Sequence, residues 1–156
     1  MNKPYLIIVI LILLVVLCTA FVFSNSLKNA EESAEDSSIL VQVVEKIAQA
    51  IAPDNQVDWN HIVRKLAHLT EFLVLGVFTT LLLLSFKQKI RFAAVCAPLC
   101  VFVIACADEL IQHFSPGRNP CFTDVMIDTA GAWTGIGLVL LFYLVLTRRL
   151  KALNNS

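Results

Sequence analysis

Apolar side chains gather along the chain in four long runs that are separated by polar segments. The runs cover residues 5–23, 62–86, 92–114 and 123–147. Each is long enough to cross the roughly 30 Å hydrocarbon core of a bilayer as a helix that rises about 1.5 Å per residue. Strands of a membrane barrel would instead alternate between apolar and polar residues over about ten positions. The pattern predicts an all-α integral membrane protein with four transmembrane helices, built as a single domain over residues 1–156.

The polar segment over residues 24–60 is acidic and carries an apolar stripe of its own. The stripe consists of Ile39, Leu40, Val43, Val44, Ile47, Ala48 and Ile51. This spacing predicts an amphipathic helix that ends at Pro53. We expect this helix to lie on the bilayer surface or to cover the mouth of the bundle, in preference to binding a partner. The first run is interpreted as a retained span, because it is longer than the roughly 7–15 apolar residues of a signal peptide.

Composition supports the membrane assignment and excludes a soluble enzyme with a buried core. Hydrophobic residues make up 58% of the chain, charged residues 15%, and the mean hydropathy is +0.76. Soluble domains average about 45–50% apolar and about 25% charged residues. The 12 basic and 12 acidic side chains cancel, and no Lys/Arg-rich stretch predicts a nucleic-acid partner. The five cysteines are an odd number, and most lie in apolar runs, so no disulfide framework is expected.

The short loops and the tail are basic, which sets the predicted orientation. Lys3, the turn over residues 87–91 and the tail over residues 148–151 contain seven basic residues and no acidic one. Cytoplasmic loops of membrane proteins carry such an excess of Lys and Arg. We therefore expect both termini of this multi-pass protein in the cytoplasm and residues 24–60 outside.

Polar residues concentrate at the outer ends of the second, third and fourth spans. In the second span, Arg64, His68 and Glu71 are four and three residues apart and so share one helix face. The third span ends in the string ADELIQHF, and a tight turn leads to the acidic start of the fourth. Ionisable groups in a membrane are costly unless paired, so they normally face the bundle interior and indicate a functional site. The candidate ligand-binding residues are Arg64, Lys65, Asp108, Gln112, Arg118, Asp124 and Asp128, and the candidate acid/base residues are His68, Glu71 and Glu109.

These strings carry a resemblance to a known family. RKLAHLTEF, then DELIQHFSPGR, then Asp124 with Asp128 and Gly131, resemble the VanZ family of small bacterial membrane proteins. The resemblance covers about residues 64–135 in order and spacing. Residues 23–26 are similar to the serine-containing segment after the family's first span.

Two positions depart from the family pattern. Phe72 stands where Tyr is common, and Asp128 stands where Asn is usual. The resemblance implies a function in the cell envelope, at the bacterial plasma membrane. The family's founding member is associated with resistance to teicoplanin, a lipid-bearing glycopeptide that acts on cell-wall precursors. The resemblance thus allows a link to antibiotic resistance without requiring one.

Three classes of function fit the polar residues. The first is recognition of an anionic lipid headgroup or a lipid-linked cell-wall intermediate at the outer leaflet. Arg64 and Arg118 would clamp the anion, since a guanidinium donates two parallel hydrogen bonds to phosphate or carboxylate. The second is an intramembrane hydrolase or transferase with His68 or Glu109 as general base. No motif places a nucleophile beside either base.

A metal-assisted version of that enzyme is ranked lower. Its ligands would come from His68, Glu71, Glu109, His113 and Asp124. The neighbouring cations favour mutual ion pairing over a metal, so neither a cofactor nor a metal is expected.

The third class is a structural or assembly protein whose charged cluster holds the helices together. The pairs would be Arg64–Glu71, Arg118–Asp124 and His68–Glu109. The fourth span also contains the pattern Gly131-x-x-x-Gly135, which permits close helix approach. That pattern fits packing within one chain at least as well as assembly into a homo-oligomer.

Overall fold

The chain forms a bundle of long helices. The computed structural model describes residues 3–28, 58–86, 89–117 and 121–154, together with positions 32, 35, 38, 41–44 and 46. The long helices are α1 (Lys3–Leu27), α3 (Trp59–Ser85), α4 (Ile90–His113) and α5 (Phe122–Asn154). All four are long and apolar enough to cross a membrane. The predicted all-α membrane fold is confirmed.

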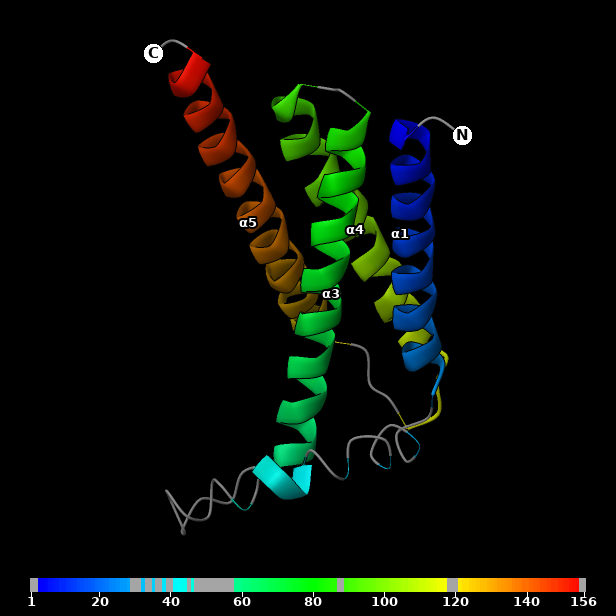
Figure 1. Ribbon diagram of the computed structural model, residues 1–156. Coiled ribbons are helices and arrows are strands. Elements are labelled where there is room, and N and C mark those ends of the chain that lie inside the picture. The colour runs from blue at the N-terminus through cyan, green and yellow to red at the C-terminus, as the bar shows by residue number, and fades with distance from the viewer. Residues whose placement is uncertain are drawn as a thin grey trace.

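Successive helices run in opposite directions, so both chain termini lie at the same end of the bundle (Figure 1). At the other end, α1 and α4 finish and α3 and α5 begin; we call this the loop end. In the view of Figure 1, α5 lies close to α3 at the loop end and leans away from the other helices towards its own C-terminus. The buried residues of α5 accordingly lie between Val125 and Ile136, in its loop-end half.

One face of α4 explains how polar groups come to lie inside the bundle. This face buries Ala93, Ala97, Val101 and Ala105, each four residues after the last. Residues four apart lie one above the other on a helix, and small side chains let neighbouring helices come close. The same stripe continues into Asp108, one turn later, which is fully buried. The helical period that builds the apolar core thus also carries the carboxylate into the interior.

Glycine lets α3 and α5 come into backbone contact. A Cβ atom at Gly131 would collide with the carbonyl oxygen of Leu69, and one at Gly135 would collide with that of Leu73. Gly76 on α3 is equally tight against the backbone of α5. The GxxxG pattern therefore serves packing within the chain.

Two helices extend beyond the runs that the sequence predicts. Helix α1 continues through Ser24, Asn25 and Ser26 to Leu27, although this stretch was expected to open the outer loop. Asn25 and Ser26 can stay helical inside the bundle because carboxylates of α3 and α4 accept their hydrogen bonds. Helix α5 continues to Asn154, so the basic tail is helical.

The amphipathic helix predicted around residues 39–51 lies largely outside the described residues. Positions 41–44 are helical, Val41 is buried, and Val44 lies against the space between α1 and α3. At the start of α3, the Asp58 side chain accepts a hydrogen bond from the backbone N–H of His61, which caps the helix.

Candidate functional site

All four helices contribute polar side chains to the interior of the loop end. Sequence reasoning assigned this site to α3, α4 and α5, and the structure brings residues of all three together. It also adds α1, through Asn25 and Ser26, and the turn after α4, through Ser115. Sequence reasoning did not name these three as site residues. The available signal was the polar string SNS at the end of the first apolar run, which is equally typical of a loop.

Asp108 is the best-anchored carboxylate of the site. Its side chain is fully buried, as is that of Ser26. The Ser26 hydroxyl donates to Asp108 Oδ1 at 2.6 Å, and Gln112 Nε2 donates to Oδ2 at 2.8 Å. Gln112 Nε2 also lies 3.4 Å from Ser26 Oγ. These contacts fix the orientation of the carboxylate, because each of its oxygens is held by a buried donor.

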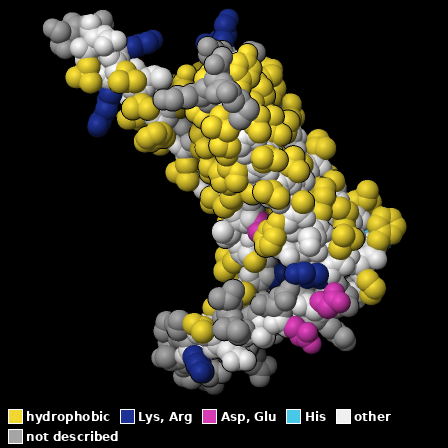
Figure 2. Space-filling model, turned by 45° about the vertical axis from the view of Figure 1, so that its right-hand side comes forward, with side chains coloured by type: hydrophobic (Ala, Val, Ile, Leu, Met, Phe, Trp, Pro, Cys, Tyr) yellow, Lys and Arg dark blue, Asp and Glu magenta, His cyan; other side chains and the backbone are white. Residues whose placement is uncertain are grey.

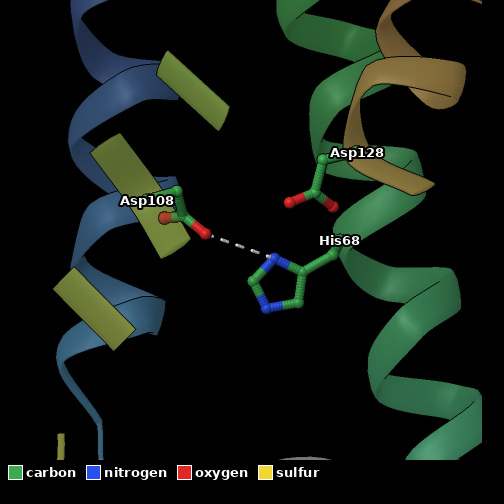
Figure 3. Close-up of side chains that lie close together, drawn as sticks. All are labelled: His68, Asp108 and Asp128. Atoms are coloured by element: carbon green, nitrogen blue, oxygen red, sulfur yellow. Dashed lines mark ion pairs between the residues drawn. The ribbon is translucent and has the colours of Figure 1, made fainter. Parts of the chain in front are cut away.

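Three of the predicted residues face one another across the bundle. His68 on α3, Asp108 on α4 and Asp128 on α5 point towards a common space (Figure 3). His68 Nδ1 lies 3.9 Å from Asp108 Oδ2, and one ligand atom from each of the three residues lies within 4.8 Å of the others. The site therefore combines an imidazole with two carboxylates in the buried interior of the bundle.

Asp128 has an unfavourable environment. Its side chain is only 2% exposed. Within the described chain, no hydrogen bond or ion pair reaches its carboxylate, and the charges that act on it belong to other acidic groups. Those groups are Asp108, Asp124, Glu109 and Glu71. Buried carboxylates normally pair with a cation or a hydrogen-bond donor, so the ionised form of Asp128 is unfavourable in this arrangement.

Glu71 lies one turn deeper along α3. Its Oε1 accepts a hydrogen bond of 2.9 Å from Asn25 Nδ2, and Lys28 Nζ in turn donates to Asn25 Oδ1 at 3.1 Å. Among the described residues, Glu71 Oε2 has no hydrogen-bond partner. The expected Arg64–Glu71 pair is wrong, because Arg64 instead lies beside His61, with Nη2 3.4 Å from Nδ1.

Glu109 and Ser115 fasten the connection between α4 and α5. Glu109 accepts a hydrogen bond from the backbone N–H of Cys121, immediately before α5 begins. The Ser115 hydroxyl donates to the backbone carbonyl of Ser26 at 2.7 Å and so ties the turn to α1. Glu109 therefore helps to position the start of α5, and the acid/base role suggested by the sequence stays a prediction.

The basic residues lie at the rim of the site. Lys65 Nζ is 2.9 Å from Asp124 Oδ1, which joins α3 to α5, and both side chains are about a quarter exposed. Sequence reasoning had paired Asp124 with Arg118. Arg118 lies outside the described residues, so the structure does not place it.

Two hollows lie against the outer turns of α3. The first is a polar cavity of about 20 Å³, enough for one water-sized occupant. It is lined by Arg64, Lys65, His68, Gln112, Asp124, Ile127 and Asp128. The second is a groove of about 820 Å³ between α1 and α3, which is almost entirely apolar except for Glu71 and Thr70. In Figure 2, one face of the molecule is apolar along most of its length, and the acidic side chains in view lie towards the loop end.

The comparisons with known proteins agree with the resemblance seen in the sequence. A family model described as VanZ/LLP1 matches residues 7–143, which is most of the chain. No curated protein and no solved structure matches it.

Proposed function

We propose, from the premise that the chain belongs to the VanZ/LLP1 family, that it is a cell-envelope protein of the bacterial plasma membrane that recognises an anionic lipid. The ligand is the headgroup of a membrane lipid or a lipid-linked cell-wall intermediate. Both termini face the cytoplasm, and the loop end faces outward, because the short loops at the terminal end are basic.

The proposal rests on one observation: the polar cavity and the apolar groove both lie against the same turns of α3. Val63, Leu66 and Thr70 face the apolar groove, while Arg64 and Lys65 line the polar cavity. A lipid with an anionic headgroup has this same division into a long apolar part and a compact charged part. Its chain would lie in the groove and its headgroup beside the two cations.

The size of the polar cavity determines where the headgroup binds. About 20 Å³ holds one water-sized group and not a phosphate ester. The headgroup therefore binds at the rim, where Arg64 and Lys65 are only partly buried. There the planar guanidinium of Arg64 can donate two parallel hydrogen bonds to phosphate, and Lys65 can contribute a point charge.

Native mass spectrometry of the gently extracted protein tests this proposal. We expect a discrete lipid adduct in the wild type that is lost or strongly reduced in Arg64→Gln. Arg91→Gln is the matched control, because Arg91 is an exposed arginine at the terminal end of α4, and it should keep the adduct. A bare wild-type protein, or an adduct equally abundant in Arg64→Gln, would contradict the proposal.

The same recognition is our proposed basis for an effect on teicoplanin susceptibility, because that antibiotic acts on cell-wall precursors. Expression of the chain in a susceptible bacterium should raise the inhibitory concentration of teicoplanin, and Arg64→Gln should remove the increase at equal protein level. An unchanged concentration with the wild type would contradict the resistance role.

One observation supports a second candidate function, an acid/base hydrolase or transferase. His68 lies next to Asp108, whose carboxylate is oriented by Ser26 and Gln112. A histidine beside an oriented carboxylate is a candidate general base. Incubation of the co-purified lipid with the wild type should then release a product that His68→Gln does not form, whereas recognition alone would leave the lipid intact.

A further inference from the structure

We propose that His68, Asp108 and Asp128 form a binding site for one divalent metal ion of the Zn²⁺ class. This site goes beyond lipid recognition, because it would bind its ion in the absence of any lipid. It also departs from the ranking that the sequence suggested, in which ion pairing was preferred over a metal.

The geometry of the three side chains suits a single ion. Each comes from a different helix, and Figure 3 places all three around one space. Their ligand atoms lie within 4.8 Å of one another. Ligand atoms about 2.0–2.2 Å from a tetrahedral Zn²⁺ lie about 3.5 Å apart, so side-chain movements of about 1 Å would close the shell.

Asp128 supplies an independent reason to expect a cation here. The side chain is 2% exposed, and the described residues offer it no hydrogen bond or ion pair. The charges around it come from further carboxylates. Because a buried carboxylate among like charges is strongly unfavourable, a dication shared with Asp108 would remove the repulsion between the two groups.

Hydrogen bonds fix the orientation of the Asp108 carboxylate, as is typical of metal ligands. Ser26 donates to one oxygen and Gln112 to the other. An ionised carboxylate offers about four lone-pair positions, so two hydrogen bonds leave room for a metal. Outer hydrogen bonds of this kind orient metal ligands and raise affinity.

The two cations at the rim have other contacts. Lys65 forms its ion pair with Asp124, and Arg64 lies beside His61. Neither contact involves the three proposed ligands. The adjoining cavity of about 20 Å³ is lined by His68 and Asp128 and has room for one further water-sized group.

The ligand types indicate the class of ion. An imidazole nitrogen favours Zn²⁺ and related transition metals over Mg²⁺ and Ca²⁺, and carboxylates are compatible with them. Three protein ligands would leave a fourth position open towards the cavity, as in catalytic rather than structural zinc sites. The ion would also join α3, α4 and α5, so binding should stabilise the bundle.

The test is a Zn²⁺ titration of the full-length protein in detergent. The protein is first stripped with a chelator and its cysteines are alkylated, because thiolates also bind Zn²⁺. Competition with a fluorescent chelator then measures affinity and stoichiometry, and thermal unfolding with and without Zn²⁺ gives a second readout. We expect one Zn²⁺ per chain and a higher Tm in its presence.

Two variants and one control locate the site. Asp128→Asn and His68→Gln should each weaken Zn²⁺ binding by about tenfold or more and abolish the Tm increase. Asp128→Asn keeps the shape of the side chain and removes a repulsive charge, so it should fold. Glu35→Gln, which removes an exposed carboxylate between α1 and α3, should bind Zn²⁺ as the wild type does.

Two results would overturn the proposal. One is a wild-type protein that binds no stoichiometric Zn²⁺. The other is Zn²⁺ binding that is unchanged in both Asp128→Asn and His68→Gln. Since this assay contains no lipid ligand, its outcome is separate from that of the lipid-adduct measurement.

Discussion

At the scale of single residues, the site depends on a contact between parts of the chain that are far apart in sequence. Ser26 and Asp108 are 82 positions apart and form a buried hydrogen bond of 2.6 Å. Ser115 adds a second contact with the same residue of α1, through the Ser26 carbonyl. The C-terminal end of α1 is therefore part of the site.

Ser26→Ala should destabilise the bundle by about 1–3 kcal/mol, because it removes a donor from a buried carboxylate. Ser24→Ala is the matched control, since Ser24 is on the same helix but exposed. The measurement is the free energy of unfolding in detergent micelles. Equal stability of the two variants would mean that the Ser26 hydroxyl contributes nothing to the site.

Helical spacing predicted that His68, Asp108 and Asp128 gather at the loop end, but it did not predict how the polar residues there pair. The i, i+4 and i+7 pattern placed His68 inside, and the buried stripe of α4 carries Asp108 to meet it. The ion pair between Lys65 and Asp124 was not predicted, and the predicted pair of Asp124 with Arg118 stays a prediction because Arg118 lies outside the described residues. Pairing depends on the rotation of each helix and on side-chain rotamers, which periodicity along one helix does not specify.

At the scale of helices, the contact between α3 and α5 holds the loop end together. Glycine has no side chain, and it stands at the points where the two backbones touch, so the helices pack in close van der Waals contact. This contact brings His68 and Asp128 within reach of each other and lets Lys65 meet Asp124. The position of the site therefore depends on a few small residues that do not take part in its chemistry.

Gly131→Ala should destabilise the protein by about 1–3 kcal/mol, because the new methyl group would collide with the Leu69 carbonyl. Gly137→Ala on the same helix is the control. A Cβ atom there meets no heavy atom within 4 Å, and alanine has the higher helix propensity. Denaturant unfolding of both variants checks the prediction, and a loss of stability in Gly137→Ala equal to that in Gly131→Ala would contradict it.

The sequence predicted all four long helices but misplaced some of their ends. Long apolar runs are strong signals, since few other structures can satisfy the backbone inside a bilayer. Helix α1 continues past its apolar run because Asn25 and Ser26 find partners on other helices. Such partners are long-range contacts, which a local pattern of hydrophobic and polar positions does not contain.

At the scale of the whole molecule, the fold separates two ends of different character. The terminal end carries the basic tail of α5, and the loop end carries the carboxylates of the site. Four spans place both termini on the same side of a membrane. That the termini share one side follows from the even number of spans. Which side they occupy is predicted from the positive charge of the short loops.

Cysteine labelling tests the predicted orientation of the bundle across the membrane. Cys121 is exposed at the loop end, and in a variant whose other four cysteines are alanine it should react with a membrane-impermeant maleimide in intact spheroplasts. Asn154→Cys in a cysteine-free background should react only after the membrane is permeabilised. Reversal of these two results would place the loop end in the cytoplasm.

The most direct test of whether Arg64 and Lys65 select an anionic headgroup is to compare the affinity of the protein for two lipids that have the same hydrocarbon chain. One carries a phosphate headgroup and the other the corresponding neutral alcohol, and the affinity of the purified protein is determined for each. We expect the wild type to bind the lipid with the phosphate headgroup about tenfold or more tightly than the lipid alcohol, a difference of about 1.4 kcal/mol. Arg64→Gln should lose most of this preference, and Arg91→Gln should keep it. Equal affinity of the wild type for both lipids, or a preference that survives in Arg64→Gln, would contradict the account.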